Sequence, residues 1–323
     1  MKTALKTLGL LLAFALTLAF GQATAQSYPT KAIKFVVGFP PGGGTDLIAR
    51  IVGEKLAERL GQPIVVDNKP GADAIIATEY AAKSAPDGYT LLAASSGAMT
   101  FSPGMYDRLP YDTLRDFAPI TQLATYPILI VANPSVAASS VKELIALAKA
   151  KPGGLFYAAG APPFRLATEL FKRQAGVDIV YVPYKGTAAA ITAAVAGQVA
   201  IAAIDMAPAL PQMKAGKLRS LAVTSPKRSA ILPDVPTMAE SGLANFDVVI
   251  WTALFAPAGT PRPIIDRLYS ELAVILRSDS VKERFASLSY DPGGITPAEF
   301  GAIVKADIAK WTRVAKEANI RAQ

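Results

Sequence analysis

A strand that runs directly into a glycine-rich loop and then a helix constrains the fold of this chain more than any other feature. Residues 33–37 are apolar, residues 38–46 contain three consecutive glycines, and residues 47–52 follow with a helical pattern. This order is typical of a parallel α/β unit. Glycine allows a sharp turn, and the first amides of a helix have no partner inside it, so a small anion can accept their hydrogens. The pattern predicts a binding site built mainly from backbone amides.

The chain has 323 residues and contains no histidine and no cysteine. These two residue types are the commonest metal ligands, and they supply the usual general base and the thiol nucleophile of enzymes. An enzyme of this composition would have to use Asp, Glu, Lys, Ser or Tyr, and we expect no metal, no cofactor and no catalytic residue. Without disulfides the fold depends on its apolar core, which a chain of this length can form in two lobes.

The first 25 residues have the pattern of an export signal. Lys2 and Lys6 give a positive start, residues 8–20 are apolar, and Ala23-Thr24-Ala25 forms a small-x-small cleavage site. A membrane anchor is the alternative, but the apolar stretch is short for a membrane span. No cysteine follows that would carry a lipid. We expect the mature protein to be soluble and outside the cytoplasm.

The basic residues are spread along the chain, which has a formal net charge of +8. The densest pairs, Lys172-Arg173 and Lys227-Arg228, have no aromatic residues interleaved. This pattern indicates a solvated surface with a weak general attraction for anions, and it predicts no nucleic-acid partner.

Strand-like runs alternate with helical patterns along most of the chain, which predicts mostly parallel sheets flanked by helices. We expect the first lobe to contain residues 26–125 and 224–323, and the second to contain residues 126–223. The chain would then cross between the lobes twice, at a hinge, with the ligand in the interlobe cleft beyond the strand ends. The predicted strands are 33–37, 64–67, 89–94, 118–123, 128–132, 155–158, 178–182, 199–205, 218–224 and 247–251. The main predicted helices start near 47 and 72 or span 164–175, 187–196, 263–277, 281–288 and 297–318.

Two short motifs suggest enzymes, and each has another explanation. Ser139 and Lys142 have the S-x-x-K spacing of some serine hydrolases, but Ser140 and Glu143 form a capping box before an apolar run, and the other hydrolase motifs are missing. Residues 42–44 followed by Asp67 resemble a dinucleotide-binding pattern, but Leu47 replaces the third glycine and the signal has no twin arginine. A dinucleotide-binding enzyme remains the less favoured alternative.

Several spaced motifs resemble the Bug receptors, the periplasmic solute-binding receptors of tripartite tricarboxylate transporters. The motifs occur in order at residues 28–31, 39–46, 60–72, 86–91, 182–186, 216–224, 232–237 and 256–261 and cover nearly the whole mature chain. The resemblance implies a two-lobed periplasmic-binding-protein fold of the flytrap type. It also implies a receptor that captures a small carboxylate and delivers it to a membrane permease. In that family, backbone amides and ordered water from both lobes hold the ligand carboxylates.

The sequence departs from the family pattern at two places. The second-lobe turn reads Gly160-Ala161-Pro162-Pro163-Phe164-Arg165, where prolines remove amide donors while Arg165 offers a bidentate carboxylate partner and Phe164 an apolar surface. Residues 73–76 replace further glycine and an asparagine. The pocket is therefore expected to accept a di- or tricarboxylate or a bulkier acid, such as an aromatic carboxylate.

The predicted ligand contacts lie in the glycine-rich loop, in the second-lobe turn and at strand ends. Loop residues such as Gly43 contact the anion or form only a tight turn, and Asp46 is expected to hold the loop in place. Ser95 and Ser96 donate to the cleft or cap a turn, and Asp205 would suit an amino group or a hinge hydrogen bond. Trp251 is expected in the core. The full set is Phe39, Pro41, Gly42, Gly43, Thr45, Asp46, Ser95, Ser96, Ala161, Pro162, Arg165, Tyr184, Gly186 and Asp205.

The expected partners are the small carboxylate and the permease subunits of a tripartite tricarboxylate transporter. We expect a monomer. A receptor that signals to a sensor kinase is the alternative with the same binding chemistry, and the sequence does not separate these two roles.

Overall fold

The computed structural model describes residues 28–317 and 319–321. The predicted export signal, residues 1–25, lies outside the described residues. Within the described ranges, no helix is both long enough and apolar enough to cross a membrane.

The described chain alternates strands and helices, and most of the predicted elements are present with shifted ends. The strands are β1 Ile33–Val37, β2 Ile64–Asn68, β3 Thr90–Ser95, β4 Phe117–Ala132, β5 Phe156–Ala159, β6 Val180–Pro183, β7 Ile201–Asp205, β8 Arg219–Val223, β9 Val249–Pro257 and β10 Asp291–Pro292. The helices are α2 Gly44–Leu60, η1 Ala72–Ala74, α3 Ile75–Ala82, η2 Gly97–Phe101, α4 Ser102–Met105, α5 Thr113–Asp116, α6 Val141–Ala150, α7 Pro162–Ala175, α8 Thr187–Val195, α9 Met206–Lys214, α10 Arg262–Arg277, α11 Asp279–Ala286 and α12 Pro297–Glu317. The sequence analysis did not predict η2, α4, α5 and β10.

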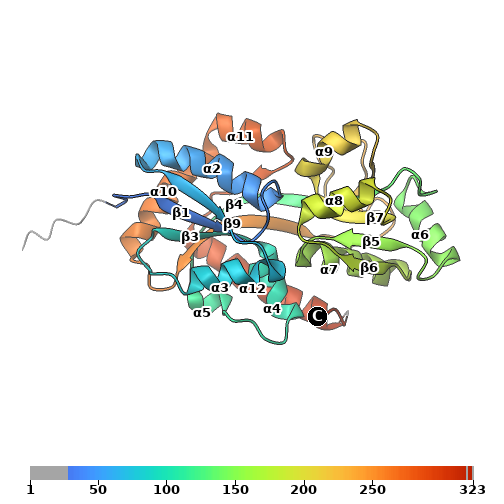
Figure 1. Ribbon diagram of the computed structural model, residues 1–323, viewed down its shortest axis with the longest axis horizontal. Helices are drawn as coiled ribbons and strands as arrows, with labels where there is room; N and C mark the ends of the chain where they lie inside the picture. The colour runs from blue at the N-terminus through green and yellow to red at the C-terminus, as the bar shows by residue number, and fades with distance from the viewer. Residues whose placement is uncertain (1–27, 318, 322–323) are drawn as a thin grey trace, which may run out of the picture.

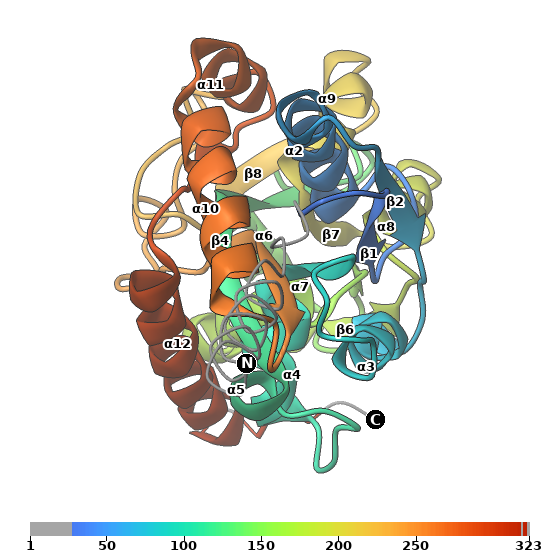
Figure 2. The ribbon, with the colours of Figure 1, turned by 90° about the vertical axis from the view of Figure 1, so that its left-hand side faces the viewer.

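The first sheet half consists of β2, β1, β3, β9 and β10 with residues 117–127 of β4. Strand β1 lies between β2 and β3 and is parallel to both, while β9 joins β3 to β4 by antiparallel pairing. Helices cover both faces of these strands, as Figure 1 shows, and Figure 2 shows α10 and α12 along one side of this half. The core here includes Phe35, Phe255 and Phe300, each at most 1% exposed.

The second sheet half repeats this order with β6, β5 and β7, together with β8 and residues 128–132 of β4. Strand β5 lies between β6 and β7 and is parallel to both. Strand β4 pairs with β7 and β8 in the antiparallel direction. Each half thus has a parallel three-stranded unit that is extended by antiparallel strands. The sheet is therefore more mixed than the sequence analysis expected, although the two-lobed α/β architecture is confirmed.

Strand β4 is a single strand of 16 residues, so the prediction of two separate strands at 118–123 and 128–132 is wrong. Pro127, which lies between the two predicted strands, lacks an amide hydrogen and is unfavourable inside a strand. Pro119 lies at a register shift against β9, and Pro127 is the last residue that pairs with β9 before β4 turns to β7. The strand is therefore continuous where its hydrogen-bond partners change, and it crosses from one sheet half to the other.

The chain returns to the first sheet half after β8, at Thr224. The Thr224 hydroxyl donates to the Val248 carbonyl at 2.6 Å and accepts the Ile128 amide at 2.9 Å. Thr224 is completely buried. One side chain therefore joins the outgoing crossing, the returning crossing and the segment that leads into β9.

Two local predictions are confirmed. Ser140 caps α6, because its hydroxyl accepts the Glu143 amide at 3.2 Å, while the Glu143 carboxylate accepts the amide and hydroxyl of Ser139. Trp251 is 3% exposed and packs against Phe255 and Phe300. The S-x-x-K spacing is thus accounted for by a helix cap.

Candidate functional site

The candidate site lies where the two parallel units face each other. In each unit the middle strand lies between its two parallel neighbours, and the helical connections to them run on opposite faces of the sheet. A crevice therefore opens beyond the carboxyl ends of the strands, at the point where the strand order reverses. The first unit brings the loop after β1 and Ser95 at the end of β3 to this place. The second unit brings Gly160, directly after β5, and Asp205 at the end of β7. The two crevices form one cavity.

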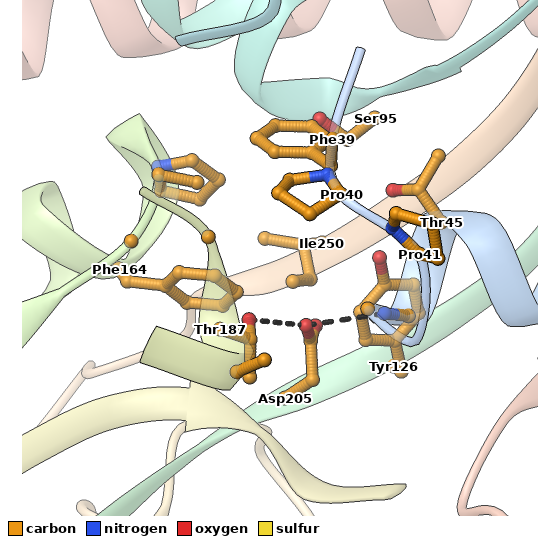
Figure 3. A pocket seen from close by; sticks show the side chains of 17 residues that line it. Phe39, Pro40, Pro41, Thr45, Ser95, Tyr126, Phe164, Thr187, Asp205 and Ile250 are labelled. Carbon is orange, nitrogen blue, oxygen red and sulfur yellow. Dashed lines mark hydrogen bonds between the residues drawn. The ribbon is translucent and has the colours of Figure 1, made fainter. Parts of the chain in front are cut away.

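The cavity is narrow and is lined mainly by apolar side chains and glycine backbone (Figure 3). Its atom-free space is about 460 Å³ when the solvent at its mouth is included. Its lining residues are Phe39, Pro40, Pro41, Gly43, Gly44, Thr45, Ser95, Tyr126, Gly160, Ala161, Pro163, Phe164, Gly186, Thr187, Ala188, Asp205 and Ile250. This described lining contains no lysine and no arginine, so any anion here depends on amides and hydroxyls.

The two halves touch around this cavity. The Asp205 carboxylate, from β7, accepts the Gly44 amide of α2 at 3.3 Å and the Thr187 hydroxyl of α8 at 2.6 Å. A methyl group on Gly97 would lie 2.9 Å from the Pro163 ring. The site is therefore in a closed arrangement, with glycine backbone of one half packed against side chains of the other half.

Two helices direct their first turns at the cavity. Helix α2 begins after Gly43, and α8 begins after Gly186, whose φ of 85° favours glycine. The first-turn amides of each helix lack partners inside the helix and favour an anion by about 0.3–1 kcal/mol at an exposed site and more when buried. Thr45, Thr187 and Ala188 are in these turns and line the cavity. The helix pair can therefore bind a carboxylate without a basic side chain.

Helix α7, which the sequence analysis placed opposite the first loop, contributes differently. Its first two residues are Pro162 and Pro163, which have no amide hydrogen, and the Phe164 and Arg165 amides donate back to Ala161. Phe164 instead contributes an apolar wall. The donors of the second half thus come from α8, because Gly186 lies against Gly160 and brings the α8 terminus into the cavity.

Asp46 holds the glycine-rich loop in its shape. Its carboxylate accepts the Gly42 amide at 2.9 Å, the Asn68 amide group at 2.9 Å and the Arg50 guanidinium at 3.0 Å, and Asn68 also donates to the Phe39 carbonyl. Burial by itself raises the pKa of Asp46, but Arg50, Gly42 and Asn68 together outweigh it and hold the pKa below its usual value. The charge is thus used within the loop and does not line the cavity.

Replacement of Asp46 with asparagine is expected to cost about 2 kcal/mol of unfolding free energy at pH 7, because charged hydrogen bonds are lost. The pKa of Asp46 is lower in the folded protein than in the unfolded chain, where it is about 4. The Asp46 carboxylate therefore makes its full contribution to the unfolding free energy above the unfolded pKa, and this contribution is lost as the pH falls through the folded pKa. Urea unfolding of the variant and the wild type at pH 7 and near pH 2.5 measures this. A difference that stays constant between the two pH values would contradict it.

The predicted site residues separate into two groups. The residues that line the cavity are Phe39, Pro41, Gly43, Thr45, Ser95, Ala161, Gly186 and Asp205. Those outside its lining are Gly42, Asp46, Ser96, Pro162, Arg165 and Tyr184. Gly42 turns its amide to Asp46, Ser96 accepts the Trp251 amide at 3.3 Å, and Pro162 is buried at the start of α7.

Arg165 and Tyr184 lie toward a neighbouring part of the cleft. The Arg165 guanidinium stacks over the Tyr181 ring with 4.8 Å to its centroid, away from the cavity. Tyr184 lines an adjoining depression with Asp73 and Tyr106, whose hydroxyl donates to Asp73 at 2.7 Å. The helical direction of α7 turns the Arg165 side chain toward β6, so the bidentate role expected for Arg165 has no support in this conformation.

The sequence analysis did not select several lining residues. Gly44 belongs to the glycine-rich loop, whereas Tyr126, Thr187, Ala188 and Ile250 come from three separate elements and no local motif marks them as neighbours. The start of α8 did carry a usable signal, because Gly186 followed by a helical run repeats the strand, glycine and helix order of residues 33–52.

Comparison with known proteins identifies this arrangement. A family model described as the tripartite tricarboxylate transporter family receptor, TctC, matches residues 48–320. The chain belongs to the TctC receptor family. BugT of Bordetella pertussis is 38% identical over 297 residues, with 91% of each chain covered. The resemblance to the Bug receptors is thereby confirmed.

Three solved structures share the fold of this chain over most of its length. The R. palustris protein Rpa4515, solved with adipate, is 37% identical with a TM-score of 0.89, over 91% of this chain and 99% of that one. MatC from Rhodopseudomonas palustris, solved with malate, is 30% identical with a TM-score of 0.83, over 89% of this chain and 99% of that one. The periplasmic binding protein BugD is 32% identical with a TM-score of 0.86, over 92% and 100%.

Proposed function

We propose that this TctC-family protein is a periplasmic receptor that captures a small carboxylate in the cavity and delivers it to the permease of a tripartite tricarboxylate transporter. Its lobes are residues 26–125 with 224–323, and residues 126–223. It acts as a monomer and catalyses no reaction. The observation that carries this proposal is the pair of helix starts, α2 and α8, that face one cavity whose described lining has no basic side chain.

The chemistry of the cavity favours binding over catalysis. A carboxylate held by fixed amides is stabilised without a charged partner, and closure of the lobes removes it from water. Asp67, the acid that the dinucleotide alternative needs for a ribose, is paired with Lys34 at 3.6 Å and Lys69 at 3.3 Å. The relatives solved with adipate and malate support the choice of a small acid as the ligand.

Titration calorimetry of the purified mature protein against mono-, di- and tricarboxylates, aliphatic and aromatic, tests the proposal. We expect a one-to-one complex with at least one acid and none with NAD. Binding of NAD without binding of any acid would favour the dinucleotide alternative. Uptake of the bound acid by vesicles that contain the permease, but only when the receptor is present, distinguishes delivery from signalling to a kinase.

Replacement of Gly43 with valine is expected to weaken acid binding at least about tenfold while the fold is retained. A methyl group at Gly43 has only the Pro40 carbonyl nearby, at 3.9 Å, so the side chain fits the protein but enters the anion's space. Calorimetry with the best acid of the screen measures the effect, and thermal unfolding checks the fold. Wild-type affinity in this variant would contradict the proposed site.

A further inference from the structure

Asp205 has a carboxylate oxygen that no described residue satisfies. Its side chain is 4% exposed, and one oxygen, Oδ2, accepts both the Thr187 hydroxyl and the Gly44 amide. The other oxygen, Oδ1, is buried and has no hydrogen-bond partner among the described residues. Figure 3 shows the carboxyl group between Thr187 and the start of α2, on the cavity wall. An unsatisfied buried acceptor is uncommon and indicates a missing donor.

Among the described lining residues, no cationic side chain balances Asp205. The ionisable side chains in the described lining are Asp205 itself and Tyr126. The Tyr126 hydroxyl bonds with Thr252 at 3.2 Å. Burial raises the pKa of Asp205, and the hydrogen bonds from Thr187 and Gly44 oppose the rise only in part. A second carboxylate placed beside this group would repel it strongly, because the cavity excludes the water that screens charges.

A second unsatisfied polar atom lies on another wall of the same cavity. The Ser95 hydroxyl, at the end of β3, is buried without a hydrogen-bond partner in the described chain. Figure 3 shows it on the side of the cavity away from Asp205. A hydroxyl can donate to a carboxylate, whereas the free oxygen of an ionised aspartate only accepts. The two walls therefore differ in what they can bind.

We propose that Asp205 selects the ligand, so that the bound acid carries a hydroxyl or amino group that donates to Asp205 while its carboxylate lies on the wall away from Asp205, where the Ser95 hydroxyl can donate to it. This inference rests on the proposed function and names its substrate class. The preferred ligand is a hydroxy or amino monocarboxylate with a slender, apolar body, since Phe39, Phe164 and Ile250 line the space between. A fully ionised dicarboxylate is disfavoured.

Matched ligands test the inference on the intact mature protein. One set has six carbons: hexanoate, 6-hydroxyhexanoate, 6-aminohexanoate and adipate. A second set has four carbons with the same end groups, and a third contains benzoate, 4-hydroxybenzoate, 4-aminobenzoate and terephthalate. In the set that fits best, calorimetry at pH 7.5 is expected to show the hydroxy or amino acid binding at least about tenfold more tightly than the dicarboxylate, because a buried group left unpaired is costly.

The variant Asp205→Asn keeps the shape and removes the charge. It is expected to lose the preference for the amino acid and to bind the dicarboxylate more tightly than the wild type does, since the amide can donate to a carboxylate. Asp307→Asn is the matched control: Asp307 is a partly buried carboxyl outside the cavity that accepts the Trp251 indole at 2.9 Å. The control is expected to leave the ligand ranking unchanged.

The results distinguish this inference from the proposed function. If the wild type binds acids but prefers the dicarboxylate in every set, the inference is wrong while the receptor function stands. Binding of a dicarboxylate together with the uptake of one proton would also overturn the inference. The proton would then be on Asp205, and Asp205 would donate a hydrogen bond to the ligand. If no acid of any set binds, the receptor function fails and the inference fails with it.

Discussion

Replacement of Gly160 with alanine is expected to abolish acid binding and to cost about 3 kcal/mol or more of unfolding free energy. A methyl group on Gly160 would overlap the carbonyl group of Gly186 and lie 2.8 Å from the Gly186 Cα. The two backbones are joined there, because the Gly186 amide donates to the Gly160 carbonyl at 3.2 Å. Overpacking of backbone against backbone has no flexible side chain to relieve it. The start of α8, with Thr187 and Ala188, must therefore move away from the cavity.

Thermal unfolding and calorimetry with the best acid of the screen measure the two effects of Gly160→Ala. The matched control is Gly301→Ala in α12, where the added methyl group has ordinary contact with Pro119 at 3.4 Å. That change is expected to be neutral or to stabilise by about 0.5–1 kcal/mol, because glycine disfavours a helix interior. Wild-type binding by Gly160→Ala would show that the approach of the two loops does not position α8.

Replacement of Thr224 with valine is expected to lower the unfolding free energy by about 3 kcal/mol. Valine fills the same volume but leaves the Val248 carbonyl and the Ile128 amide without the hydroxyl that now bonds to both. A buried polar group left unpaired costs about 1–3 kcal/mol. Because Thr224 joins both crossings between the sheet halves, acid binding is expected to weaken as well.

Urea unfolding of the ligand-free protein measures the cost of Thr224→Val. Thr192→Val on α8 is the control, because its hydroxyl donates to the Ala188 carbonyl on an exposed helix surface. Its effect is expected to stay within about 0.5 kcal/mol, as for most surface substitutions. Equal effects of the two changes would mean that the Thr224 contacts do not stabilise the crossing.

The first half of the site was predictable because its parts are adjacent in sequence. Strand β1, the loop and α2 follow one another within residues 33–60, and local rules for glycine and for helix starts apply directly. The capping role of Ser140 was predictable for the same reason, since its partner is three residues away. In both cases the chemistry depends on neighbours along the chain.

The second half of the site was not predictable in the same way. The sequence analysis paired the first loop with residues 160–165, and Arg165 was expected to bind the acid. In the structure α7 turns Arg165 onto Tyr181, and the first turn of α8 lines the cavity instead. The position of α8 at the cavity depends on the contact between Gly160 and Gly186. These two residues are separated in the chain by α7 and approach each other only when β5 and β6 pair.

The sequence by itself determined the alternation of strands and helices and the glycine-rich loop at the start of α2, because both follow from residues close together, and the resemblance of its spaced motifs indicated the family. Only the tertiary structure decided that β4 is one continuous crossing strand, that α8 faces α2, and that Asp205 joins the two helix starts with one oxygen still unpaired. Those features depend on contacts between distant segments, and such contacts are set by the packing of the whole chain.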